Sequence, residues 1–289
     1  MEQAIIPLKE LPLRNDFMFG QVMRNPRICK LFLEALLGKQ IDRIQYIDRQ
    51  KDLKDGWLSH GIRLDVYLKD KLGTVYNIEM QATGEPGQER RVRYYQSGID
   101  RYELESGDPY FELSESYIIF LCDFDYYKKG LAVYERVSYL KGTDLEYNDG
   151  SHAMFLNSHY ETGNAKPEIL EFLDYIRTND EHKGYQSQLV KETMAEVISV
   201  RNDEKLGASY MTVAMKLLDE RRAGHREGLK QGMEKGRKEG RKEGREEGIR
   251  AAAVMLKDLV DRDTAIEKLV QQFGLTRETA EEKVAQYWD

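Results

Sequence analysis

Residues 61–82 read GIRLDVYLKDKLGTVYNIEMQA. The two halves alternate apolar and polar side chains and are joined by the glycine-containing turn KDKLG, a pattern that predicts an antiparallel hairpin. Side chains two residues apart on a strand point to the same face. Asp65 on the first strand, and Glu79 and Gln81 on the second, are therefore expected on one polar face of the hairpin.

The two acids of this face are candidates for a metal site. Antiparallel pairing can bring the Cβ atoms of Asp65 and Glu79 to about 5 Å from each other. Two carboxylates at that distance repel unless a cation or a proton lies between them. Their oxygens are hard ligands, which suit Mg²⁺ or Mn²⁺. The alternative interpretation is a face that is merely solvated, because polar side chains on an exposed hairpin need no function.

The sequence around the hairpin mixes helical and strand patterns. NDFMFGQVM opens a helix with Asn15 as its cap, and RICKLFLEALLG is a second helix that ends at Gly38. Helical spacing returns in ERRVRYYQSGIDRYELES, whereas ESYIIFLCDFD fits a buried central strand. IDRIQYID reads as a short strand, and LAVYERVSYL and HAMFLNSHY alternate like edge strands. From about Ala165 the pattern is helical.

Composition excludes several classes of protein. A net charge of −7 gives no global attraction to a polyanion, so contact with nucleic acid needs a local basic patch. Cys29 and Cys122 lie in apolar runs and predict no disulfide or zinc site. His152 and His159 are expected to be structural, because the histidines show no metal-ligand spacing. No signal-peptide layout or membrane-length apolar run is present, so we expect a cytoplasmic protein without membrane contact.

A glycine recurs every four residues from Gly224 to Gly248, seven times in all. Seven helical glycines would cost about 7 kcal/mol relative to alanine, so an isolated helix should be unstable here. The run is either a flexible charged linker or a helix with a close partner, of which the same segment of a second chain is the favoured one. A basic arm that binds nucleic acid is a third interpretation, which the interleaved glutamates weaken.

The segment after the glycine run reads as a small helical unit, residues 251–289, with Gly274 between its last two helices. The spacing is similar to that of a helix-turn-helix. Five basic and eight acidic residues give this unit a net charge of −3, whereas a DNA-reading helix normally lies on a basic surface. A helical cap or a dimerisation element is therefore the favoured interpretation.

Several motifs occur in order between Leu11 and Tyr139: NDFMF, RLDVYLKDKLGTVYNIEMQ, RRVRYYQSGIDRYELESGDPY and YIIFLCDFDYY. This set resembles the PD-(D/E)XK nuclease superfamily, and within it the recombination-promoting nuclease or transposase family. The resemblance implies an α/β core in which a mixed central sheet is flanked by helices, as in restriction endonucleases. With the patterns described above, we expect this core in residues 1–160, followed by a helical extension (161–223), the glycine-rich segment (224–250) and the C-terminal unit (251–289).

The resemblance also implies roles for single residues. Asp65 matches the first acid, Glu79 matches the acid of the second motif, and Gln81 stands where that motif has lysine. Asp16 matches an acid on the first helix that often assists with the metal; the alternative is a first-turn acid that favours the helix dipole. The arginines Arg63, Arg90 and Arg91 are the expected phosphate ligands, because guanidinium binds phosphate in a bidentate manner.

The implied function is a metal-dependent DNA endonuclease that uses Mg²⁺ or Mn²⁺ and is associated with transposition or recombination. DNA is the implied partner, and the C-terminal helices are expected to make a homodimer or a higher homo-oligomer. Two departures from the family pattern support an alternative. Gln81 replaces the lysine, and Gly20 replaces a basic residue after the NDFMF phenylalanine. The alternative is a catalytically weak or inactive nuclease fold that binds DNA or protein.

Overall fold

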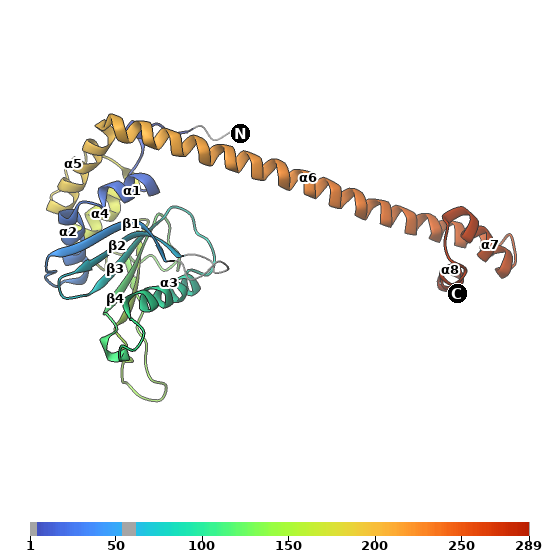
Figure 1. Cartoon of the computed structure of the whole chain (residues 1–289), viewed down its shortest axis with the longest axis horizontal. Helices are drawn as coiled ribbons and strands as arrows, with labels where there is room; N and C mark the ends of the chain where they lie inside the picture. The colour runs from blue at the N-terminus through green and yellow to red at the C-terminus, as the bar shows by residue number, and fades with distance from the viewer. Residues whose placement is uncertain (1–4, 54–61, 289) are drawn as a thin grey trace. The chain divides into compact units, whose positions relative to one another are not determined.

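The computed structural model describes residues 5–53 and 62–288, and the side chains of 46–53 and 62–64 lie outside the described part. The chain divides into two compact units, Met1–Val213 and Ala214–Asp289 (Figure 1). The motifs that resemble a nuclease all lie in the first unit.

The first unit is built around a six-stranded sheet with the order β1-β2-β3-β4-β6-β5. Antiparallel pairs join β1 to β2, β2 to β3 and β5 to β6, whereas β3, β4 and β6 run parallel. The sheet is therefore mixed, as predicted. The strands are β1 (Ile44–Leu53), β2 (Ile62–Asp70), β3 (Val75–Gln81), β4 (Ser116–Cys122), β5 (Val133–Glu135) and β6 (Ser151–Asn157).

The helices of this unit begin and end where local signals predict. The Asn15 side chain accepts hydrogen bonds from the N–H groups of Phe17 and Met18, and Gly38 ends the second helix with a φ of 69°. The helices are α1 (Asp16–Val22), α2 (Pro26–Leu37), α3 (Gln88–Glu103), α4 (Pro167–Thr178), α5 (Gln188–Asn202) and the start of α6 (Glu204–Lys257), with short 3-10 turns η1 (Leu8–Glu10) and η2 (Tyr110–Glu112).

Side chains of the sheet alternate between two cores. Val66 and Ile78 belong to the core that α1, α2, α4 and α5 complete, whereas Tyr67 and Val75 pack with residues of α3. In Figure 1, α3 lies on one side of the sheet and the other four helices on the opposite side. The interpretation of the polar hairpin face as merely solvated is wrong for Glu79, because this side chain is completely buried.

Helices α4 and α5, the first part of the predicted extension, share the core of the sheet. Phe172 of α4 and Val190 of α5 are fully buried in the same cluster as the β-strands. The expectation that both late strands lie at an edge is correct for β5 and wrong for β6. Strand β6 lies between β4 and β5, and its Ala153 and Met154 enter opposite cores.

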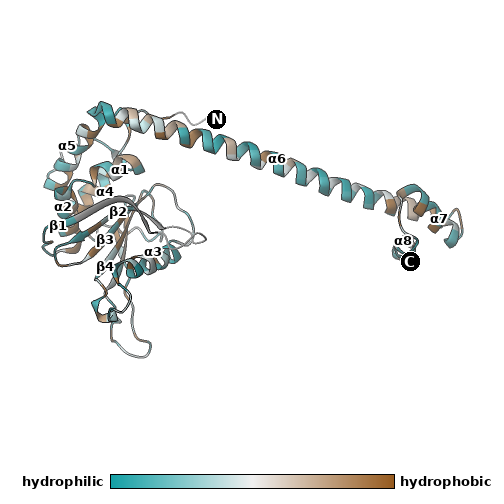
Figure 2. Ribbon diagram, in the orientation of Figure 1, coloured by the Kyte–Doolittle hydropathy of each residue, from teal (hydrophilic) through white to brown (hydrophobic). Residues whose placement is uncertain are grey.

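The second unit consists of most of α6 followed by α7 (Arg262–Phe273) and α8 (Arg277–Trp288). The glycine run is helical throughout as part of α6, and most residues along this part of the helix are hydrophilic (Figure 2). Ala253, Leu269 and Val284 pack where the three helices meet. Of the helices that the structure describes, none is long and apolar enough to cross a membrane.

The turn of the β2–β3 hairpin depends on Asp70. Its carboxylate accepts hydrogen bonds from the N–H groups of Leu72 (2.9 Å) and Thr74 (3.0 Å) and from the hydroxyl of Tyr76 (3.0 Å). Asp70, Thr74 and Tyr76 are buried, so two of these three donors lack easy access to water, whereas Leu72 is exposed. The turn that aligns the two strands is therefore specified by one carboxylate.

We predict that Asp70→Ala lowers the free energy of unfolding by about 2–4 kcal/mol, because it leaves buried donors without an acceptor. Urea denaturation of the full chain measures this loss. The control is Asp42→Ala, since Asp42 is exposed and accepts a hydrogen bond from the adjacent N–H of Arg43. Equal losses for the two variants would contradict the role of Asp70.

Candidate active site

The structure brings Asp65 and Glu79 together at the end of the β2–β3 ladder. The backbone register pairs Val66 with Ile78, so the next residues along each strand face each other. The N–H of Asp65 donates a hydrogen bond to Oε1 of Glu79 (3.1 Å), and the N–H of Met80 donates to Oδ2 of Asp65 (3.1 Å). Each carboxylate is thus held by the backbone of the opposite strand.

Burial of this pair makes its charge costly. Burial, and after it the negative charge of Asp65, raise the pKa of Glu79 to about 8. The N–H of Asp65 and the guanidinium of Arg91 act in the opposite direction, but they do not outweigh these causes. A cation held between the two carboxylates would remove their repulsion.

Arg91, in the first turns of α3, reaches over the same face. Its Nη2 donates to Oε2 of Glu79 (3.1 Å), its Nη1 donates to Oε1 of Gln81 (2.7 Å), and its Nε donates to the hydroxyl of Tyr95 (2.8 Å). The guanidinium also lies 4.9 Å from the centre of the Tyr95 ring and 5.5 Å from that of Phe120. Arg91 is therefore fixed in place beside the acidic pair.

Gln81 ends β3 at the rim of the site. Its Nε2 donates to the carbonyl of Met80 (2.9 Å), so its Oε1 points to Arg91. The carbonyl of Gln81 accepts the N–H of Asp123, the residue after β4 (2.9 Å). The position expected for lysine is thus occupied by an amide whose oxygen contacts an arginine from the neighbouring helix.

The other predicted site residues are Arg90, Asp16 and Arg63. Arg90 is exposed on α3, and Asp16 lies in the first turn of α1. Among the residues that the structure describes, no group of three or more Asp, Glu, His or Cys side chains is placed to hold a metal ion by itself. The backbone of Arg63 lies in β2, but its side chain is outside the described part.

Sequence reasoning missed two features of the site. It assigned Arg91 to phosphate alone, although the spacing from Glu79 and the turn of α3 bring Arg91 onto the carboxylate. It also did not single out Asp123, which follows the central strand directly and whose N–H donates to the carbonyl of Gln81. The place of Asp123 directly after a predicted central strand is a usable signal of a site residue, because parallel strands place the residues that follow them at the same edge of the sheet.

A comparison with models of protein families shows which family this chain belongs to. The model of the PD-(D/E)XK nuclease family transposases matches residues 13–216. The chain belongs to this family. The PD-(D/E)XK match covers both the motif-bearing strands and the α4–α5 pair, which agrees with their shared core. Comparisons with curated proteins and with solved structures found no match.

The buried carboxyl of Glu79 predicts a pH-dependent contribution to stability. Because its folded pKa is raised, the native state keeps a proton that the unfolded state releases between about pH 4.5 and pH 8. The stability that this group contributes is full below about pH 4.5 and is lost as the pH rises toward 8. Glutamine does not titrate, so only the parent loses this contribution. In EDTA, the unfolding free energy of Glu79→Gln minus that of the parent should therefore rise by more than about 1 kcal/mol from pH 5 to pH 7.5.

Urea denaturation at several pH values measures this trend, and the slope rather than the offset is the test. Glu112→Gln is the control, since Glu112 lies exposed on η2. If the unfolding free energies of Glu79→Gln and of the parent changed equally with pH, that result would contradict the raised pKa of Glu79.

Proposed function

We propose that this chain is a metal-dependent endonuclease that hydrolyses phosphodiester bonds in DNA, in the context of transposition or recombination. The observation that carries the proposal is the pair of carboxylates, Asp65 and Glu79, held across the hairpin by backbone N–H groups. Membership of a nuclease family supports the same conclusion. A buried acidic pair that repels itself is costly for stability alone, so a role in binding a cation accounts for it.

The donor set fits a divalent cation such as Mg²⁺ or Mn²⁺. Mg²⁺ in phosphoryl-transfer sites is commonly held by one or two carboxylates, with water and substrate oxygens completing the shell. Asp65 and Glu79 would hold the ion, and Asp16 is proposed to assist from the start of α1. When bound, the ion lowers the pKa of a water molecule and stabilises negative charge on the phosphate.

The remaining side chains are proposed to position the reactants. The amide of Gln81 lies at the rim of the site and would orient the attacking water through hydrogen bonds, since an amide cannot supply charge. Arg91 would supply the positive charge that lysine provides in other members of the superfamily, because its guanidinium contacts both Gln81 and Glu79. Arg63 and Arg90 are proposed to hold the phosphate backbone.

A second candidate function rests on the contacts of Arg91. The ion pair of Arg91 with Glu79 compensates the negative charge that a metal ion would need. Both polar ends of Gln81 are also occupied by protein groups. If Arg91 stays in place, the chain would be a catalytically weak or inactive nuclease fold that binds DNA or protein. The two functions differ in whether a cation can displace Arg91 from the acidic pair.

We also propose that the C-terminal helices make a homodimer. In the described chain, a Cβ atom added at any of the six glycines from Gly224 to Gly244 would meet nothing within 4 Å, so this stripe is open to a partner. Paired helices would offset the cost of about 1 kcal/mol per glycine, because glycine lets two backbones approach. Two active sites in one particle also suit the cutting of both strands of a duplex.

Charges beside the glycine stripe favour a parallel, in-register pair. One flank carries arginines that directly follow glycines, and the other carries glutamates that directly precede them. A twofold axis parallel to the helices places the arginine flank of one chain against the glutamate flank of the other, whereas an antiparallel pair places like charges together. The two flanks are Arg237, Arg241 and Arg245, and Glu239, Glu243 and Glu247.

A cytoplasmic setting is proposed for this function. Cys29 and Cys122 are free and buried, which suits a reducing compartment. The proposed DNA substrate lies in the same compartment in cells without a nucleus.

The endonuclease proposal predicts nicking of supercoiled plasmid by the full chain in Mg²⁺ or Mn²⁺, and no nicking in EDTA. Asp65→Ala and Glu79→Ala should each lower the rate by at least about 100-fold, because each removes a ligand of the catalytic ion. Gel analysis of the nicked and linear forms measures the rate.

Asp42→Ala, a change of the same type at an exposed acid, is the control and should cut like the parent. Cutting by both site variants at the parental rate would refute the assignment of Asp65 and Glu79. Retained DNA binding without cutting by the parent would instead favour the second candidate function.

The parallel homodimer predicts a charge-reversal pattern in light scattering of the full chain. Changing the three flank arginines to glutamate, or the three flank glutamates to arginine, should each shift the mass toward that of a monomer, because both flanks then repel. Mixing the two variants should restore the dimer, since every flank then meets its opposite charge.

Reversal of Lys230, Lys238 and Lys242 to glutamate is the matched control, because these residues lie two positions after glycines, on the far side of α6 from the stripe. A monomeric parent would refute the proposed dimer. Flank variants that keep the parental mass would refute the parallel arrangement.

A further inference from the structure

A second polar cluster lies at the same edge of the sheet as Gln81. Asp123 directly follows β4, and His159 follows β6 by two residues, so both lie where the parallel strands end. The N–H of Asp123 donates to the carbonyl of Gln81 (2.9 Å), which joins the cluster to the end of β3. None of the proposed catalytic steps uses these side chains.

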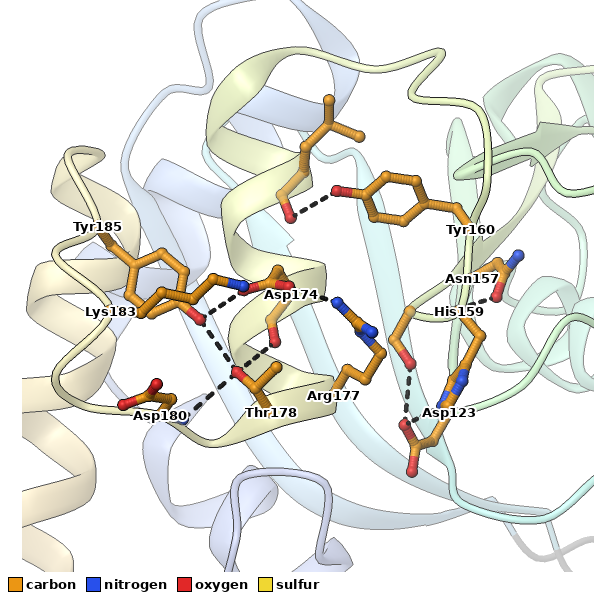
Figure 3. A network of polar contacts seen from close by, with 12 residues as sticks. Asp123, Asn157, His159, Tyr160, Asp174, Arg177, Thr178, Asp180, Lys183 and Tyr185 are labelled. Carbon is orange, nitrogen blue, oxygen red and sulfur yellow. Dashed lines mark hydrogen bonds and ion pairs between the residues drawn. The ribbon is translucent and has the colours of Figure 1, made fainter.

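The first half of the cluster is organised by Asp123, whose side chain is only 13% exposed. Its Oδ1 accepts the hydroxyl of Ser158 (2.9 Å) and lies 3.3 Å from Nε2 of His159 (Figure 3). Its Oδ2 lies 3.5 Å from Nη1 of Arg14, in the segment that leads into α1. The arginine side chain is 43% exposed, so the carboxylate is covered and the cation faces the solvent.

The second half is organised by Asp174 of α4. Its carboxylate accepts hydrogen bonds from Arg177 (2.7 Å), Lys183 (2.6 Å) and the hydroxyl of Tyr185 (2.7 Å), as Figure 3 shows. Burial would raise the pKa of Asp174, but the hydrogen bonds from Lys183, Tyr185 and Arg177 outweigh it and lower the pKa. Asp174 is therefore ionised at neutral pH and holds two cations in place.

The two halves are joined through Arg14. Its Nη1 also donates to the carbonyl of Arg177 (3.2 Å), which brings three cationic side chains to one surface. Arg177 and Lys183 are about as exposed as Arg14, whereas Asp123 and Asp174 lie beneath them. Each guanidinium has five N–H donors, more than the contacts above use. The surface therefore offers fixed donors to an anion.

We propose that Arg14, Arg177 and Lys183, held by Asp123 and Asp174, form a second binding surface for the phosphate backbone of DNA. The proposal rests on the proposed nuclease function, and it adds a contact on the α1–α4 side of the sheet. Exposed Arg90 and Arg93 of α3 lie on the opposite side, so a strand that crosses the edge at Gln81 would meet basic groups on both sides.

The ends of β3 and β6 lie two steps apart across the sheet, which is about 10 Å at the usual distance between strands. Asp180, an exposed carboxylate at the rim of the cluster, would oppose an anion there; its side chain accepts the N–H of His182 (2.8 Å).

The test measures binding of a fluorescent duplex by the full chain in an Asp65→Ala background, so that bound DNA stays intact. Adding Arg14→Gln and Lys183→Gln should weaken binding about tenfold or more at about 0.1 M salt, and should lower the slope of log affinity against log salt by about two. The charge-keeping changes Arg14→Lys and Lys183→Arg should retain the parental slope.

Arg27→Gln with Lys30→Gln is the matched control, because these cations lie on α2, outside the cluster, and pair with Glu192 and Glu34. Thermal unfolding of each variant checks the fold; should the double variant unfold, Lys183→Gln alone is expected to lower the slope by about one. An unchanged slope in the folded Gln variants overturns the surface but leaves the nuclease proposal standing. A background protein that binds no duplex overturns both.

Discussion

Two carboxylates held against each other at the end of the β2–β3 ladder are the interaction on which the rest of the structure depends. Asp65 and Glu79 each accept a backbone N–H from the opposite strand, so each side chain is held across the hairpin by a hydrogen bond. Burial and mutual repulsion raise the pKa of Glu79, which means that the fold bears an electrostatic cost at this point. A cation bound between the two carboxylates would remove this cost.

The surroundings of the pair balance this charge with an arginine. Arg91 contacts Glu79 and Gln81 and is fixed by the hydroxyl of Tyr95, so a positive charge lies beside both residues. The side chain of Gln81 accepts a hydrogen bond from Arg91, and its backbone carbonyl accepts the N–H of Asp123. In the proposed function, Arg91 of α3 would supply the positive charge that the resemblance leads one to expect from a lysine at position 81 of the strand.

The hairpin and the facing acids could be predicted from the sequence because alternation and a short glycine-containing turn are local signals. The burial of Glu79 could not, because it depends on α3 folding back over the polar face after a loop that ends at Gly87 with a φ of 88°. The same holds for β6: its alternating pattern fits an edge strand, and only parallel pairing with β4 makes it internal. The contact between Asp123 and His159 depends on the parallel pairing of β4 with β6, and the periodicity of the sequence does not reveal it.

The central claim is that the acidic pair binds a divalent cation despite the contact with Arg91. Isothermal titration calorimetry of Mg²⁺ and Mn²⁺ into the full chain tests it without reference to DNA or to cutting. The account predicts saturable binding at or below millimolar concentration that Glu79→Ala abolishes and Asp42→Ala leaves intact. Absence of binding at millimolar concentration, or binding that survives Glu79→Ala, would contradict it.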